Sequence, residues 1–289
     1  MKDRIPESEF ILNADGSVYH LHLRNEDIAD TVILVGDPGR VSVIASYFDK
    51  VEVEKQNREI HTKTGYVGDK RLTVISTGMG TDNIDIVVNE LDAAVNIDPK
   101  TRIVKENKRV LNLIRLGTSG GLNANINAGD FIASAYTVGL DGLLYFYENS
   151  ESVFERKLID KFIKHTEWKS NLPSIYSVKA SSCLLEKYAF DLKHGITLTS
   201  PGFYAPQGRE LRLNLAFPEF NGLVENFYYK DIPIANFEME SSALYGLGQM
   251  LGHNTLTICT IIANRVNKTF SNNYKEDVER MIELVLGRL

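Results

Sequence analysis

The stretch "IPIANFEMESSALYGLGQMLGHNTLTICTIIAN", residues 232–264, contains a complete strand–helix–strand unit. Residues 232–238 form a short and almost continuous apolar run, which predicts a buried strand. The small-residue segment 241–252 predicts a helix, and residues 254–264 form a second apolar run of strand type. Strands that lack polar alternation are typical of sheets with both faces covered. This unit therefore indicates an α/β protein.

The same alternation of short apolar runs and amphipathic segments recurs along the rest of the chain. We therefore predict one domain over residues 1–289, a three-layer α/β/α arrangement around a central mixed sheet. The basic, polar segment 98–109 is predicted to be a surface loop. Further strands are predicted at 31–36, 71–78, 110–117, 129–136, 174–180 and 194–200, and further helices at 40–48, 83–97, 151–165 and 274–289.

Composition excludes several classes of protein. The 289 residues are 43% apolar, which is enough for a large core. The net charge of −6 does not indicate the basic surface that is typical of nucleic-acid-binding proteins. No stretch approaches the roughly 20 apolar residues of a membrane span, and the opening "MKDRIPESEF" lacks the apolar core of a signal peptide. The two cysteines, Cys183 and Cys259, form no CxxC motif. We therefore expect buried, inert thiols, no metal site and a cytoplasmic location.

Two predicted strands end in residues suited to an anion. In "VGDPGR" the glycines and Arg40 stand at the start of a helix, where free N–H groups favour anions, although an ordinary Asp-Pro-Gly turn has the same letters. In "IRLGTSGG" Arg115 lies within an apolar strand, where an arginine must be paired or face a ligand. A structural ion pair is the alternative. The Lys-Ser/Thr ending of a P-loop is missing.

Two acids, Glu238 and Glu240, stand where the strand 232–238 ends. Side chains one residue apart on a strand point to opposite faces, so one acid could be structural while the other faces a pocket. A carboxylate accepts well from a vicinal diol. The alternative is that both acids cap the following helix, whose dipole favours negative charge.

A fourth candidate is "GFYAPQGREL", residues 202–211. Phe203 and Tyr204 could form an aromatic wall, and Gln207 and Arg209 could bind the polar edge of a flat heterocycle. A solvated surface loop is the alternative. The chain contains no HExxH or P-loop motif that would indicate a different chemistry.

Taken together, seven motifs resemble those of the nucleoside phosphorylases of the trimer-or-hexamer type, and the pattern is most similar to that of uridine phosphorylases. The motifs occur in the family's order from about His20 to the C-terminal helix: "GDPGR", "NREIHT", "STGMG", "RLGTSGG", "FYAPQGR", "FEMESS" and "IIANR". The resemblance implies phosphorolysis of uridine to uracil and ribose 1-phosphate in pyrimidine salvage. It also implies inorganic phosphate as co-substrate, no cofactor, and deoxyuridine and thymidine as further candidate substrates.

The resemblance also implies a role for each motif residue. Four residues would act in catalysis: Arg115, Gln207, Arg209 and Glu240. The implied phosphate-binding residues are Gly36, Arg40, Arg58, Arg115 and Thr118, and the ribose-binding residues are His20, Met239 and Glu240. The implied base-binding residues are Ser119, Gly120, Phe203, Gln207, Arg209, Ile262 and Ala263.

The resemblance further implies that each site is shared between subunits. Arg58 would reach a neighbour's phosphate and His20 a neighbour's ribose, beside an aromatic cover from Tyr19. At least a dimer is therefore expected, and a hexamer of three dimers is typical of the family. Within one subunit, Arg265 would hold the Gln207 loop in place.

Two departures bear on substrate and ions. Purine-cleaving relatives carry an aspartate after the strand that here ends in Ala263 and Asn264, so the missing acid favours a pyrimidine. Some bacterial relatives bind an interfacial monovalent cation near a serine where this chain has Asn83, which argues against such an ion with Glu59 as ligand.

Other functions on the same fold stay open at this point. A nucleosidase would use water and would not need three arginines for phosphate, which favours a phosphorylase. Another nucleoside phosphorylase and a non-catalytic nucleoside-binding protein are the remaining alternatives.

Overall fold

The computed structural model describes residues 4–289, so the first three residues of the opening segment lie outside it. Within that range twelve strands form one mixed sheet, with the order β12-β11-β6-β8-β10-β5-β1-β4-β3-β2, β7 beside β6 and β9 beside β10. The strands are β1 (Thr31–Val35), β2 (Lys50–Asn57), β3 (Ile60–Val67), β4 (Lys70–Ser76), β5 (Asn112–Gly121), β6 (Phe131–Gly139), β7 (Tyr176–Lys179), β8 (Lys193–Thr199), β9 (Tyr228–Tyr229), β10 (Ile232–Glu238), β11 (Asn254–Asn264) and β12 (Thr269–Phe270).

Strand direction divides the sheet into two parallel groups. One group contains β4, β1, β5 and β11, and the other contains β6, β8 and β10. The groups meet antiparallel at β10–β5 and at β11–β6. Because β5 pairs with both β10 and β11, the five strands β5, β10, β8, β6 and β11 close into a ring. Bulges in β11 and β6 accompany this closure, since an extra residue bends a strand.

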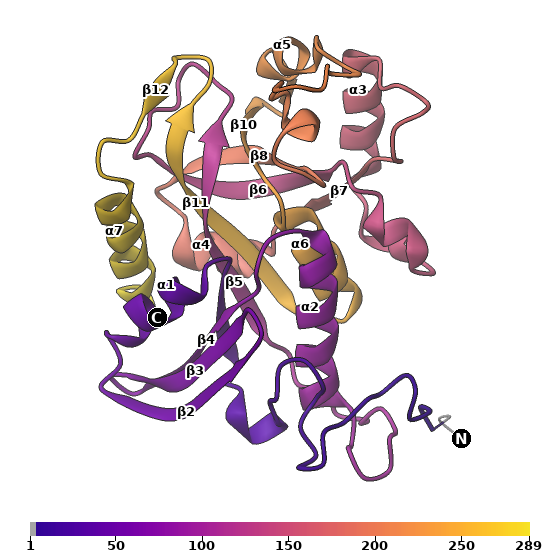
Figure 1. The fold of residues 1–289 in the computed structure, drawn as a ribbon, viewed down its shortest axis with the longest axis vertical. Helices are drawn as coiled ribbons and strands as arrows, with labels where there is room; N and C mark the ends of the chain where they lie inside the picture. The colour runs from indigo at the N-terminus through magenta and orange to yellow at the C-terminus, as the bar shows by residue number, and fades with distance from the viewer. Residues whose placement is uncertain (1–3) are drawn as a thin grey trace.

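Helices cover the sheet on both sides, which confirms the predicted three layers (Figure 1). They are α1 (Pro38–Ala45), α2 (Thr81–Asn96), α3 (Arg156–Thr166), α4 (Ser182–Tyr188), α5 (Phe220–Glu225), α6 (Ser241–Met250) and α7 (Tyr274–Leu286). In Figure 1, α2 and α6 lie on one side of β5 and β11, while α1 and α7 lie on the other. The helices α2 and α6 also contact each other directly.

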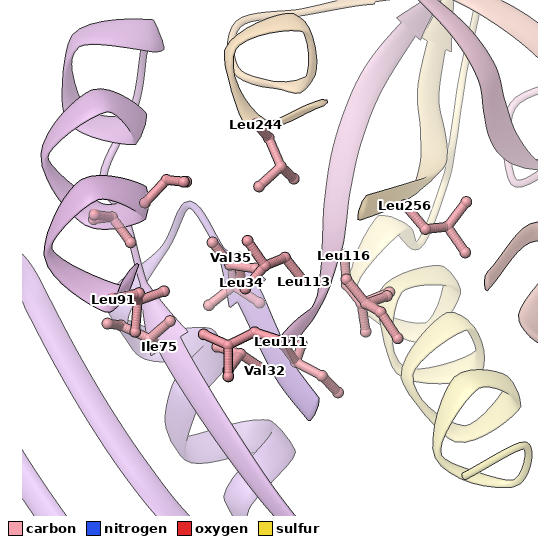
Figure 2. Close-up of a cluster of buried hydrophobic side chains, with 14 of the residues drawn as sticks. Val32, Leu34, Val35, Ile75, Leu91, Leu111, Leu113, Leu116, Leu244 and Leu256 are labelled. Atoms are coloured by element: carbon pink, nitrogen blue, oxygen red, sulfur yellow. The ribbon is translucent and has the colours of Figure 1, made fainter. Parts of the chain in front are cut away.

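The core between these layers is aliphatic (Figure 2). Leu34, Leu113 and Leu116 from β1 and β5 are fully buried, as are Leu244 of α6 and Leu256 of β11. Because such interiors are close-packed, the strand ends above this core are held in fixed positions.

The structure departs from the sequence predictions at several elements. The β2–β3 hairpin at the edge of the sheet was not predicted, because β2 is exposed and rich in charge rather than apolar. The helix predicted at 151–165 begins only at Arg156, after a short 3₁₀ turn. Cys259 is buried as expected, but the expectation for Cys183 was wrong, since that side chain is exposed on α4. The loop at 98–109 is confirmed, with one isolated bridge at its start.

Within residues 4–289, no helix combines the length and the apolar character that crossing a membrane requires.

Candidate active site

A buried ion-pair cluster forms where the end of β10 meets the middle of β5. Arg115 donates from Nη2 to the carboxylate of Glu240, and its Nη1 lies 3.4 Å from Glu238 Oε2. All three residues are only 4% exposed. Burial alone would lower the pKa of Arg115, but the charges of Glu240 and Glu238 raise it overall. The Arg115 Nε atom is buried without a partner among the described residues, which leaves one donor for a ligand.

The local sequence makes room for this arginine. A Cβ atom on Gly117 would lie 2.0 Å from Arg115 Nη1, so the side chain can fold over the strand only because residue 117 is a glycine. The same Nη1 atom also contacts the Cys259 sulfur, at 3.5 Å. Burial raises the pKa of the Cys259 thiol to about 12, so this cysteine stays protonated and inert.

Glu238 has a structural role. Its carboxylate accepts from the backbone N–H of Glu240 at 3.0 Å, from the N–H and hydroxyl of Ser241, and from the Thr199 hydroxyl at 2.6 Å. Burial raises the pKa of Glu238, against the lowering effect of Arg115 and these hydrogen bonds. The capping interpretation is therefore confirmed for this acid, because it binds the first N–H groups of α6.

The expectation that Glu238 and Glu240 point to opposite faces was wrong. The strand β10 ends at Glu238, and Glu240 leaves the extended conformation with φ −137° and ψ −31°. Both carboxylates therefore turn toward the same guanidinium. Glu240 Oε1 also accepts from the Gly80 N–H at 2.8 Å, and its Oε2 accepts from the Met239 N–H at 3.3 Å. A carboxylate can accept about four hydrogen bonds, so Glu240 keeps capacity for a sugar hydroxyl.

The predicted phosphate residues Gly36, Arg40 and Arg115 lie around this cluster. Arg40 at the start of α1 donates to the Leu116 carbonyl at 3.1 Å. Burial first, and then repulsion from Arg115, lower the pKa of Arg40. Gly36 closely approaches the next strand end, since a Cβ on it would lie 3.4 Å from the Gly78 carbonyl. Two guanidinium groups that repel each other at the end of β1 are suited to share an anion.

A second group of predicted residues lies beyond the end of β5. Gln207 is buried, and its Oε1 accepts from Arg209 Nη1 at 2.7 Å and from Arg265 Nη2 at 3.5 Å. Arg265 Nη1 also donates to the Gln207 carbonyl, which confirms that Arg265 holds this loop. Burial, and then Arg209, lower the pKa of Arg265 to about 10. The Arg209 guanidinium stacks 3.6 Å from the centre of the half-exposed Phe203 ring.

The backbone between the two groups comes from paired strands. Gly120 of β5 lies level with Ala263 of β11, next to the half-buried Ile262. A Cβ on Gly120 would meet no atom within 4 Å, so open space adjoins it. The Ser119 hydroxyl is held by Asn236 Nδ2 at 2.8 Å. The remaining predicted residues, Thr118 and Met239, are half-buried.

Ala263 and Asn264 end the strand after which purine-cleaving relatives are expected to carry an acid, and the Asn264 amide is fully used. Its Nδ2 donates to the carbonyls of Asn123 and Ile126 at 2.9 and 2.6 Å, and its Oδ1 accepts from two backbone N–H groups. The Asn264 side chain therefore links two loops by hydrogen bonds, and its amide has no donor left for a base.

His20 and Arg58 form a separate group at the tip of the β2–β3 hairpin. His20 Nδ1 lies 2.5 Å from Glu90 Oε1, and the Asn57 amide donates to the His20 carbonyl at 2.9 Å. Arg58 is exposed in a left-handed turn with φ +53°. Within residues 4–289, its guanidinium forms no ion pair.

No cluster of three or more His, Cys, Asp or Glu side chains suited to a metal ion occurs within residues 4–289. Glu59 lies beside Asn83, since a Cβ on Gly78 would contact both side chains.

Gly80 was missed as a candidate from the sequence. Its N–H reaches Glu240 from 160 residues away in the chain. The signal available was the pair of glycines in "STGMG", which adopt φ +72° and +100° and so turn the backbone toward the acid.

Comparison with known proteins identifies the class. The chain belongs to the Phosphorylase superfamily, whose family model matches residues 30–288. It is 29% identical to a uridine phosphorylase of Thermococcus kodakarensis, over 93% of this chain and 86% of that protein. It is 28% identical to a DeoD-type purine nucleoside phosphorylase of Clostridium novyi, over 92% and 97%.

A solved structure agrees with this assignment. A nucleoside phosphorylase of Trypanosoma brucei, described as showing uridine phosphorylase activity, matches with a TM-score of 0.82 and 26% identity. The match covers 97% of this chain and 99% of that one.

Proposed function

We propose that this enzyme cleaves uridine with inorganic phosphate to give uracil and ribose 1-phosphate. The similarity to uridine phosphorylases supports the reaction. The observation that carries the choice of base is the buried amide of Gln207, held by Arg209 and Arg265. Because both guanidinium groups donate to its oxygen, the oriented amide presents its Nε2 donors to a carbonyl oxygen on the polar edge of a pyrimidine.

Phosphate would bind between Arg40 and Arg115, with Gly36 and Thr118 beside it. A dianion there would relieve the repulsion by Arg115, which after burial is the second cause of the lowered pKa of Arg40. It would also give the unpartnered Arg115 Nε a hydrogen-bond acceptor. These features favour phosphorolysis over hydrolysis, because water needs neither positive charge.

The reaction would need no protein nucleophile. A phosphate oxygen attacks the anomeric carbon, and the bond from that carbon to the uracil nitrogen breaks with its electron pair going to the base. Glu240, with Met239 beside it, fixes the ribose hydroxyls. Arg209 and Gln207 stabilise the negative charge that develops on the uracil oxygens. Catalysis would thus come from positioning and charge stabilisation.

The base would lie against Phe203, with Ser119, Gly120, Ile262 and Ala263 forming the rest of its pocket. A purine would find no acid at Asn264, whose amide is used in loop contacts. Deoxyuridine and thymidine keep the pyrimidine edge and are further candidate substrates.

Each site would be completed by a second subunit. Arg58 is exposed at a hairpin tip, and Glu90 holds His20 Nδ1, which leaves Nε2 free to meet a neighbour's ribose. The exposed side chains Tyr19 and Met79 would be covered in such a dimer. We therefore propose at least a two-fold dimer, assembled as a hexamer of three dimers. Two free cysteines fit a reducing, cytoplasmic location.

The test is a product assay on the purified protein with uridine, thymidine and inosine, each with and without phosphate. We expect uracil release from uridine only when phosphate is present, and essentially none of the base from inosine. Equal cleavage without phosphate would indicate a nucleosidase, and equal cleavage of inosine would overturn the pyrimidine assignment.

A further inference from the structure

The segment that follows β6 connects the two helices whose first turns flank Glu240. The helix α2 begins directly after Gly80, which donates to Glu240, and α6 begins directly after Glu240 itself. Residues 141–147, here called the strap, include a 3₁₀ turn at Leu143–Phe146. The strap contacts α6 at one end and α2 at the other.

The α6 end of the strap is Asp141. Its Oδ2 accepts from the Ser242 hydroxyl at 3.1 Å, and its Oδ1 accepts from the Tyr176 hydroxyl at 2.7 Å and the Leu143 N–H at 2.8 Å. Burial raises the pKa of Asp141, which has no cationic partner among the described residues. Such a carboxyl is costly to bury, and three donors offset that cost.

Tyr176 restricts the positions that Asp141 and Ser242 can adopt. Its side chain is fully buried and lies flat on the backbone of Gly139, where a Cβ would come within 2.4 Å of the ring. Its hydroxyl also lies 2.8 Å from Ser242 Oγ. Ser242 and Asp141 are therefore tied twice, once directly and once through Tyr176. Ser242 N–H in turn donates to Thr199 Oγ1, which donates to Glu238.

The α2 end of the strap is Tyr147. Its hydroxyl donates to the carboxylate of Asp85 and accepts from Asn89 Nδ2 at 3.0 Å. Both partners lie in α2, on the first turns after Gly80. Burial, and then Asp85, raise the pKa of Tyr147 to about 12, so the phenol keeps the proton that it donates.

We propose that Asp141 and Tyr147 are positioning residues that set the place of Glu240, and through it the selection of ribose over 2-deoxyribose. The strap fixes the separation between α2, which begins after the carboxylate donor Gly80, and α6, which begins after Glu240 itself. This inference rests on the proposed function. A site that binds a substrate hydroxyl discriminates against the analogue without that hydroxyl only if the protein's accepting group is held in position.

The test compares Asp141→Asn and Tyr147→Phe with the control Tyr145→Phe. The control removes a hydroxyl from the same strap that binds only the Ile175 carbonyl, at 2.7 Å, and touches neither helix. We expect the kcat/KM ratio of uridine to 2'-deoxyuridine to fall about three- to tenfold in both strap variants, the equivalent of one hydrogen bond. The KM for phosphate should stay unchanged, and the control should keep the wild-type ratio.

An unchanged ratio in both variants, with melting temperatures lowered as in the control, would overturn the positioning role. If Asp141→Asn does not fold, Ser242→Ala cuts the same link and is expected to lower the ratio equally. If the wild-type protein does not cleave uridine with phosphate, the proposed function fails by itself. The ratio of binding affinities for uridine and 2'-deoxyuridine, measured by calorimetry, then decides the role of the strap.

Discussion

Arg265 donates a hydrogen bond to the main-chain carbonyl of Gln207, and the same guanidinium approaches the Gln207 side-chain oxygen at 3.5 Å. Arg265 itself is fixed by its backbone N–H on the Gly121 carbonyl and by the Phe237 ring beneath its guanidinium. The ends of β5 and β10 thus set the position of the proposed base-binding amide, although Gln207 lies on a loop.

Replacing Arg265 by methionine should therefore weaken uridine binding. The charge-assisted hydrogen bond to the Gln207 loop is lost, which is worth about 1.5–3 kcal/mol. We expect the KM for uridine to rise by about tenfold or more and the KM for phosphate to stay constant, as measured by steady-state kinetics with each substrate varied. Arg280→Met, on the exposed face of α7, is the matched control. Equal increases in both KM values would contradict the local role.

Substitutions at Arg40 and Arg115 should differ in their effect on stability, although both residues are proposed to bind phosphate. Arg115→Met leaves two buried acids without their cation, so about 3–5 kcal/mol of unfolding free energy should be lost. Arg40→Met breaks no ion pair within residues 4–289 and should change the melting temperature little. It should still raise the phosphate concentration needed for half-maximal rate by about 10- to 100-fold. Calorimetric melting temperatures and phosphate titrations of the rate check both variants. A similar decrease in melting temperature in the two variants would contradict the different structural roles of Arg40 and Arg115.

Mixing Arg58→Ala with Arg40→Ala protein should restore activity that neither has alone. In a mixed dimer, the Arg58→Ala subunit keeps its own Arg40 and receives Arg58 from its neighbour, so one site is intact. Random exchange should give roughly a quarter of wild-type activity, because half of the dimers are mixed and each has one good site. Subunit exchange is verified by native mass spectrometry. No recovery after confirmed exchange would show that the sites are not shared.

Asn264→Asp should not create purine activity, although it places an acid at the end of β11, where one is expected in purine-cleaving relatives. A carboxylate there would face the carbonyls of Asn123 and Ile126 and lose both donated hydrogen bonds. The cost should be about 1–3 kcal/mol for each unsatisfied buried group. Thermal melting and an inosine assay test this. A stable Asn264→Asp protein that cleaves inosine would disprove it.

The sequence by itself determined the class of fold. Periodicity and near-continuous apolar strands are local properties, so the segments 31–36, 110–117 and 254–264 could be assigned as buried strands and the three layers inferred. The motif residues could likewise be named, because glycine, arginine and acid at a strand end are chemically unusual wherever they occur. The pairing of Arg265 with the Gln207 loop was also correctly predicted.

Only the tertiary structure decided how these residues meet. Glu238 and Glu240 turn to the same arginine because β10 ends between them, and Gly80 reaches Glu240 because α2 begins beside α6. The closed ring of five strands depends on β5 pairing with both β10 and β11, and the hairpin that carries Arg58 is held by edge pairing rather than by an apolar pattern. The physical reason is the same in each case. Register, strand bending and helix placement are set by contacts between residues far apart in the chain, and local periodicity does not record them.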